Sequence, residues 1–106
     1  MNAQTGAPLA FEEKNLQRVA SLLKTTANDR RLCILYELMA HPERSVGQLE
    51  KVSGLSQSAL SQHLAKMRKD EIVKTRRSAQ TIYYSISSSE IRDLLTALLQ
   101  IFNKPA

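Results

Sequence analysis

Apolar residues recur at helical spacing in the first part of the chain and predict two helices. Over residues 9–26 the apolar positions follow the spacing i, i+3, i+4 and i+7, at Leu16, Val19, Ala20 and Leu23. Asn28 is placed to cap a second helix, which ends before Pro42 because the residue preceding proline disfavours the helical conformation. This second helix is apolar over much of its circumference, so it is expected at the centre of the core.

A short helix, a tight turn and a longer helix are predicted between residues 45 and 70. Ser45 is a favourable N-cap for the short helix, and Gly54 suits the left-handed conformation that ends a helix. Ser56 caps the longer helix, which runs to about Asp70. This combination is typical of a helix-turn-helix.

After Glu71 the pattern changes to β-branched and aromatic residues, which predict a hairpin over residues 72–86. Its strands are expected at 72–76 and 81–86, joined by a polar tip of Arg77, Ser78, Ala79 and Gln80. This hairpin is the only β structure expected in the chain.

A last helix at residues 88–103 is predicted from leucines at helical spacing, with Ser87 and Glu90 as a capping box at its start. The expected fold is mainly α with a small β-hairpin, in the order α-α-α-α-β-β-α. A flexible segment at 1–8 is expected to precede a single domain at 9–106.

Positive charge is concentrated in residues 51–86. This third of the chain carries seven basic residues against only two acidic ones, whereas the segments before and after it are each balanced. The basic residues are Lys51, Lys66, Arg68, Lys69, Lys74, Arg76 and Arg77. A clustered basic field attracts polyanions, since phosphates bound to it release their counterions. A nucleic acid is therefore the expected partner.

One side of the helix at residues 56–70 has the chemistry of a DNA-reading surface. Its apolar side carries Leu60, Leu64 and Met67, and the other side is built of small and amide side chains. A helix fits the major groove, where glutamine can make two hydrogen bonds to adenine. The DNA contacts expected from this helix are Ser56, Gln57, Ser58, Ser61, Gln62 and Lys66. The alternative is an ordinary surface helix with a polar face.

At the hairpin tip, Arg76, Arg77 and Gln80 carry long polar side chains that could reach a minor groove or the DNA backbone. Charges at a hairpin can instead serve only to discourage strand-to-strand aggregation. The helix just upstream favours DNA contact.

The segments SQSALSQHLAKMR and VKTRRSAQTIYYSI, in this order, resemble the ArsR/SmtB family of winged-helix transcriptional regulators, closest to the NolR, HlyU and BigR type. The resemblance implies a winged helix-turn-helix that binds an inverted-repeat promoter site of double-stranded DNA as a homodimer, most simply as a repressor. It places recognition-helix contacts on Gln57, Ser58, Ser61, Gln62 and His63, and wing contacts on Arg76, Arg77 and Gln80.

The resemblance also implies pairing through the first and last helices, at 9–26 and 88–103. The apolar stripes of both helices exceed what a small core can cover, and an exposed stripe of that kind usually marks an interface. The expected dimer contacts are Leu16, Val19, Leu23, Leu94, Leu95, Leu98, Leu99 and Phe102.

The switches that many family members carry are missing from this chain. The metal-binding Cys-x-Cys of the third helix is replaced by residues 45–49, and the last helix has Glu90 and Asp93 but no histidine. Tyr36 stands where the sulfur-sensing branch has its first cysteine. No metal, cofactor or dithiol is therefore expected.

Two interpretations are possible for each of two residues, Cys33 and His63. Cys33, the only cysteine, is expected as inert core packing or as a redox-responsive thiol, because free cysteine is commonly buried. His63 is expected to pack against the core or to touch a phosphate.

Enzyme motifs are absent from the sequence. A non-sensing interaction module is the other alternative, and the cytoplasm, without membrane contact, is the expected location.

Overall fold

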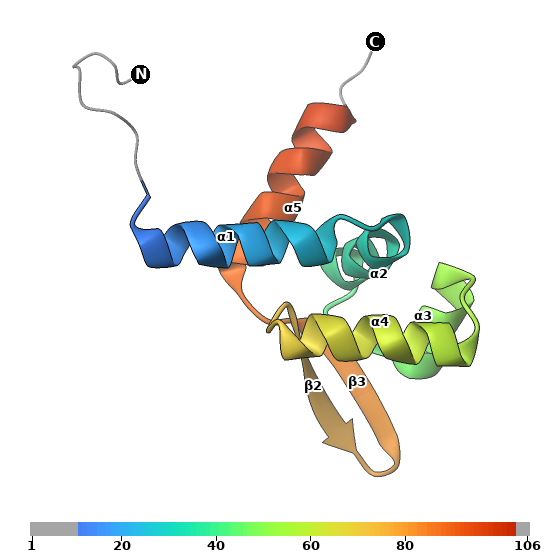
Figure 1. Ribbon diagram of the computed structural model, residues 1–106. Helices are drawn as coiled ribbons and strands as arrows, with labels where there is room; N and C mark the ends of the chain where they lie inside the picture. The colour runs from blue at the N-terminus through green and yellow to red at the C-terminus, as the bar shows by residue number, and fades with distance from the viewer. Residues whose placement is uncertain (1–10, 104–106) are drawn as a thin grey trace, which may run out of the picture.

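The computed structural model describes residues 11–103 (Figure 1). Five helices and three strands follow one another along these residues. Their order is α1 (Glu13–Thr26), α2 (Asp29–Ala40), β1 (Arg44–Ser45), α3 (Val46–Ser53), α4 (Gln57–Lys69), β2 (Val73–Ser78), β3 (Thr81–Ile86) and α5 (Ser89–Phe102). The expected order of helices and hairpin is confirmed, and β1 is added to it. The proposed flexible segment at 1–8 lies outside the described residues.

Three helix starts follow the predicted capping residues. The Asn28 side chain accepts hydrogen bonds from two backbone N–H groups of α2, and Ser56 accepts one from Ala59. Ser45 forms a capping box with Gln48 at the start of α3. Gly54 ends α3 with φ of 68°, the left-handed conformation that glycine adopts without a steric cost. The turn of the helix-turn-helix is thus determined by local residues.

The start of α5 differs from the prediction. Ser88, not Ser87, is its N-cap, and the Ser88 hydroxyl accepts a hydrogen bond from the N–H of Ile91. Ser87 still belongs to the strand connection, because its N–H donates to the carbonyl of Ile72 and its hydroxyl to the carbonyl of Glu71. Glu90 therefore makes no capping box.

The three strands form an antiparallel sheet in the order β1-β3-β2. Strand β2 continues to Ser78, so Arg77 pairs with Ile82 inside the ladder and only Ala79 and Gln80 form the turn. The predicted four-residue tip is therefore wrong. The hydrogen bonds between paired strands are made by backbone groups. Pairing can therefore continue through polar residues, where alternation of apolar and polar side chains does not predict a strand.

Twelve buried apolar residues form one core between α2, α3, α4, the sheet and the first half of α5. They are Ile34, Leu35, Leu38, Leu49, Leu60, Leu64, Met67, Ile72, Val73, Ile86, Ile91 and Leu95. The central position predicted for α2 is confirmed. Helix α1 begins later than expected, at Glu13, and contributes only Thr25 and Thr26 to the buried residues. Residues 9 and 10 lie outside the described part.

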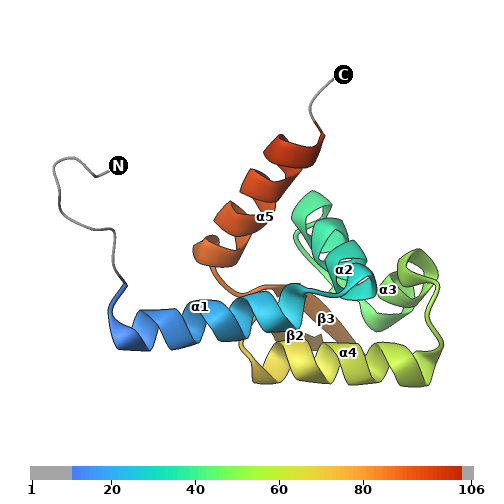
Figure 2. The same cartoon turned by 45° about the horizontal axis from the view of Figure 1, so that its top comes forward.

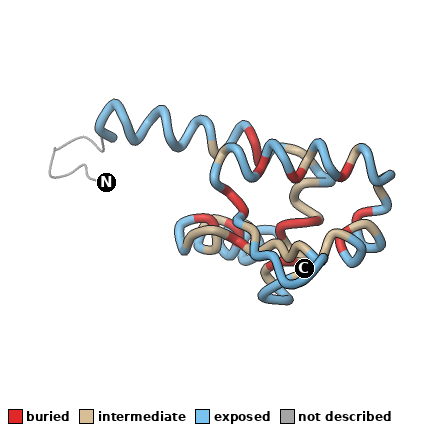
Figure 3. The backbone as a smooth tube through the Cα atoms, turned by 90° about the horizontal axis from the view of Figure 1, so that it is seen from below, coloured by how far each residue is buried: buried red, intermediate tan, exposed pale blue. Residues whose placement is uncertain are grey.

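The outer parts of α1 and α5 extend away from the body of the fold. In Figures 1 and 2 the C-terminal half of α1 lies beside α4, while α5 leaves the body on the side opposite to the β2–β3 hairpin. Figure 3 shows the N-terminal half of α1 as an exposed arm. No helix within residues 11–103 is long and apolar enough to cross a membrane.

Candidate DNA-binding surface

Helix α4 separates core residues from polar residues along its length. Leu60, Leu64 and Met67 are buried beneath it. The side chains on the opposite face are exposed, and no hydrogen bond joins them to another residue between 11 and 103; they are Gln57, Ser58, Ser61 and Gln62. Their donors and acceptors are therefore available to an external partner, as the sequence predicts.

His63 turns toward the body of the protein rather than to this face. Its Nδ1 accepts a hydrogen bond from Arg31 Nε at 2.9 Å, and Arg31 Nη1 also donates to the Thr25 carbonyl at 3.0 Å. The imidazole is half-buried. Of the two interpretations of His63, this contact favours packing against the body of the fold.

The C-terminal end of α4 is tied to α1 by one carboxylate. The Thr25 hydroxyl donates to Asp70, and Lys66 Nζ lies 3.3 Å from the same carboxyl oxygen. The hydroxyl of Thr25, followed by Lys66, holds the pKa of Asp70 below its ordinary value. Lys66, predicted to bind phosphate, is thus also a partner of Asp70 at the end of the same helix.

We expect this carboxylate to give the fold a measurable pH dependence. A lowered folded-state pKa contributes stability that is present above the unfolded value of about 3.9 and is lost as pH falls through the folded value. At neutral pH, Asp70→Asn is expected to lower the free energy of unfolding by roughly 1 kcal/mol. The gap from wild type should narrow in urea titrations as pH falls from about 5 toward 3.

Asp93→Asn, on the exposed surface of α5, supplies the matched amide substitution. It controls for the loss of one negative charge. A pH-independent gap for Asp70→Asn would contradict the role assigned to Asp70.

The arginines of the hairpin lie on opposite faces of β2. Arg76 donates two hydrogen bonds to Glu43, at 2.9 and 2.8 Å, and its guanidinium carbon lies 4.8 Å from the centre of the Tyr83 ring. Arg77 and Gln80 are exposed. Arg76 lies within the strand, as its predicted bounds of 72–76 required, so grouping it with the DNA contacts of the hairpin tip was wrong: it stands mid-strand, opposite Tyr83.

A groove between α4 and the sheet adds two basic residues that the sequence reasoning counted but did not place. Arg68 and Lys69 line it together with Ser61 and Ala65 of the exposed α4 face and Tyr84 of β3. Both residues belong to the basic run KMRK at 66–69, but a helical projection of the sequence places them on the solvent side of the helix. Only the sheet beside them turns this face into a groove.

A second surface, of apolar residues, extends over α1 and α5. Its exposed members and their exposed fractions are Leu16 (48%), Val19 (37%), Leu23 (49%), Leu99 (43%) and Phe102 (79%). Leu94 and Leu98 are half-buried. Phe11 and Ile101 are also exposed at 58% and 59%, and Phe11 escaped prediction because it stands outside the helical repeat.

Leu95 requires a correction. It was predicted as a dimer contact, yet it is fully buried in the core of its own chain. The hydroxyl of Tyr36 donates to its carbonyl at 2.7 Å, which holds this turn of α5 against α2. The inner part of the α5 stripe therefore packs within the chain, and only the outer part is exposed.

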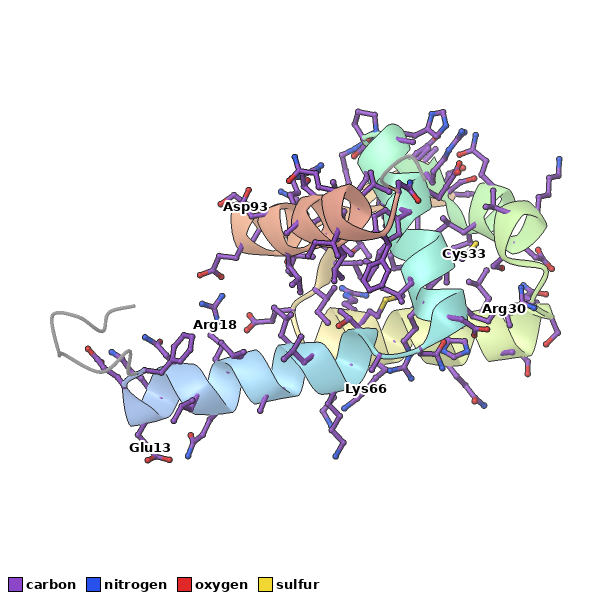
Figure 4. The ribbon with its side chains drawn as sticks, turned by 90° about the horizontal axis from the view of Figure 1, so that it is seen from above. Glu13, Arg18, Arg30, Cys33, Lys66 and Asp93 are labelled. Atoms are coloured by element: carbon purple, nitrogen blue, oxygen red, sulfur yellow. The ribbon has the colours of Figure 1, made fainter. Side chains whose placement is uncertain are left out.

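An ion pair joins the two helices that carry this surface. Arg18 of α1 and Glu90 of α5 make two hydrogen bonds, one of 2.9 Å. The hydrogen bond to Glu90 raises the pKa of Arg18, and the hydrogen bond from Arg18 lowers the pKa of Glu90, so both side chains are charged. Figure 4 shows Arg18 directed across the gap between the helices. A cavity lined mainly by apolar residues of α1 and α5 surrounds this pair.

Cys33 is half-buried between α2 and α3 (Figure 4). Its sulfur lies 3.8 Å from the carbonyl oxygen of Val52. Within residues 11–103, no three His, Cys, Asp or Glu side chains gather in a way that could hold a metal ion.

Known bacterial regulators match this chain over nearly its whole length. Residues 28–75 match the family described as bacterial regulatory protein, arsR family. The transcriptional activator HlyU of Vibrio cholerae is 46% identical over 99 residues, which cover 92% of this chain and 91% of HlyU. The biofilm growth-associated repressor of Agrobacterium fabrum is 42% identical over 98 residues, covering 92% and 83% of the two chains.

Solved structures extend the match from sequence to fold. The structure of HlyU from Vibrio cholerae superposes with a TM-score of 0.82 at 46% identity, over 88% of this chain and 100% of that one. NolR from Sinorhizobium fredii gives 0.79 at 46% identity, over 94% and 100%. The winged helix-turn-helix fold and the family resemblance are thereby confirmed. With this identity over nearly the full length of both chains, the protein belongs to the ArsR family of DNA-binding transcriptional regulators and is not an enzyme.

Proposed function

We propose that the protein is a repressor that binds an inverted-repeat promoter site as a homodimer. The observation that carries this proposal is the exposed polar face of α4, whose four side chains have no hydrogen-bond partner within residues 11–103. In a major groove, Gln57 and Gln62 would each meet base edges, while Ser58 and Ser61 let the helix approach closely. The N-terminus of α4 at Ser56 offers N–H groups to a phosphate.

Phosphate contacts would surround this reading face. Arg68 and Lys69 would hold the backbone in the groove between α4 and the sheet, and Arg77 and Gln80 would reach it from the end of the hairpin. These cations supply attraction without sequence preference, since phosphates are the same at every base pair. Specificity then depends on the short polar residues, and affinity on the basic ones.

The apolar surface of α1 and α5 supports the homodimer. A two-fold pair uses the same surface on both copies, and the exposed leucines of α1 and α5 together with Phe102 would supply it. Such a pair would present two α4 helices to half-sites about one turn of DNA apart, ~34 Å. The site it reads would therefore be an inverted repeat.

The test is to select bound fragments from the host genome and to follow binding and transcription on one selected promoter. We expect transcription in vitro to fall as occupancy rises, because a dimer on the promoter excludes polymerase. Gln62→Ala should weaken binding to the selected fragment by about 1 to 3 kcal/mol and relax base preference at one position. Increased transcription with occupancy would identify an activator instead, as the name of HlyU indicates for that relative.

The matched variant for Gln62→Ala is Arg77→Ala, which removes a charge rather than a base contact. It should weaken binding to selected and random DNA alike and reduce the salt slope by about one. An equal loss on both DNAs for Gln62→Ala would count against direct base reading by α4.

A further inference from the structure

Glu43, Tyr83 and Arg76 form a bridge across the whole width of the three-stranded sheet. Glu43 immediately precedes β1, Tyr83 lies on the central strand β3, and Arg76 lies on β2, directly opposite Tyr83 in the ladder. The Arg76 guanidinium lies over the Tyr83 ring and donates two hydrogen bonds to the Glu43 carboxylate. The bridge therefore joins the outer strand of the hairpin to the body of the protein.

Bidentate pairing of this kind constrains geometry more than it stabilises. A guanidinium bound to a carboxylate through two parallel hydrogen bonds has a defined orientation. Both side chains are partly exposed, Arg76 at 54% and Glu43 at 37%, and exposed ion pairs contribute little to overall stability. An isolated two-stranded hairpin is itself only marginally ordered. The Arg76–Glu43 pair, halfway along β2, therefore acts mainly on the orientation of the hairpin relative to the rest of the protein.

The two arginines of β2 serve different faces of the hairpin. Side chains alternate along a strand, so Arg77 shares its face with Val73, which is in the core, and Arg76 does not. Tyr84, opposite Thr75 on the Arg77 face, lines the groove beside α4. Arg77 therefore belongs to the side of the hairpin that meets the reading helix, and Arg76 to the other side.

We propose that Glu43 and Arg76 are positioning residues that set the angle of the hairpin relative to α4, so that Arg77 meets the DNA backbone. Neither of them touches DNA. This inference rests on the proposed function, which assigns the backbone contact to Arg77. The hydrogen bond from Arg76 also holds the pKa of Glu43 below its ordinary value, so the carboxylate is charged under all conditions used for DNA binding.

The experiment measures binding of the full-length protein to the selected fragment and to a random duplex by fluorescence anisotropy at several salt concentrations. Glu43→Gln is expected to weaken binding to both DNAs by about 3- to 10-fold, the coupling expected within one ion-pair network. The further effect of Arg77→Ala should be smaller in the Glu43→Gln background than in wild type. Exchanging the charges, with Glu43→Arg and Arg76→Glu together, should restore much of the loss.

The control variant is Glu13→Gln, which removes the same charge at the far end of α1 (Figure 4). It should leave binding within about 2-fold of wild type, since it changes only the net charge. Thermal unfolding of Glu43→Gln should stay close to that of wild type, because an exposed pair adds little stability. If the pair only stabilised the fold, Glu43→Gln would lower the unfolding temperature but would not change the contribution of Arg77 to DNA binding.

Three results would overturn the inference. If Glu43→Gln tightens binding and Arg76→Gln weakens it, Arg76 contacts phosphate itself and Glu43 competes with the DNA. If Glu43→Gln binds like wild type while Arg77→Ala is weakened, the bridge has no positioning role, although the proposed function stands. If Arg77→Ala binds DNA like wild type, Arg77 makes no contact with the DNA backbone and the inference fails. The proposed function would still be supported if Gln62→Ala loses base preference.

Discussion

Replacing Leu16 with glutamate is expected to convert the proposed homodimer into a folded monomer and to lower affinity for an inverted repeat by about 100-fold or more. Leu16 is 48% exposed on α1, so a charge there stays hydrated in the monomer. In a dimer the same charge would be buried without a partner, which is strongly unfavourable. Binding by one reading unit instead of two loses the roughly 10²- to 10⁴-fold gain that linkage provides.

Sedimentation at micromolar concentration and binding to a full repeat and a single half-site measure these two effects. Gln17→Glu introduces the same charge at the neighbouring exposed position of α1 and should remain dimeric, since it lies off the apolar stripe. A monomeric wild-type protein that still binds the repeat cooperatively would refute the proposed interface. So would a Leu16→Glu variant that remains a dimer.

Replacing Leu95 with alanine is expected to cost about 2 to 5 kcal/mol in the free energy of unfolding, as for other large-to-small changes in a packed core. Leu95 is fully buried and belongs to the same core cluster as the buried residues of α2 and α4. The cavity left by the missing side chain would be only partly closed by its neighbours. Urea unfolding in the Leu16→Glu background measures this cost without a contribution from dimer dissociation.

Leu99 supplies the contrast, because it stands one helical turn beyond Leu95 on the same helix and is 43% exposed. In the monomeric background, Leu99→Ala should change the free energy of unfolding by less than about 1 kcal/mol. In the wild-type background it should weaken self-association instead. Equal losses for Leu95→Ala and Leu99→Ala in the monomer would contradict the division of α5 into a core part and an exposed part.

The helix-turn-helix could be predicted closely because its boundaries depend on neighbouring residues. The side chains of Asn28, Ser45 and Ser56 bond to N–H groups two or three positions ahead, and Gly54 reverses the chain by its own backbone freedom. Such interactions are complete within a few residues, so the order of the amino acids specifies them. The exposed polar face of α4 follows from the same helical geometry.

The hairpin was predicted less well because its contacts join distant parts of the chain. Strand β1 exists only through pairing with β3, and Glu43 meets Arg76 only because the sheet brings them together. The role of Ser88 rather than Ser87 likewise depends on the bond from Ser87 to Ile72. Propensity and spacing describe neither kind of contact, since both partners are needed to define it.

The sequence by itself determined the family, the helix-turn-helix and the concentration of positive charge, because local spacing and residue type carry that information. The tertiary structure alone decided which groups are free to act. It assigned Leu95 to the core and Leu99 to the surface, although both occupy the same apolar stripe of α5. It also bound Arg76 to Glu43 and left Arg77 exposed. Burial and pairing depend on what packs against a side chain, and a linear pattern cannot supply that.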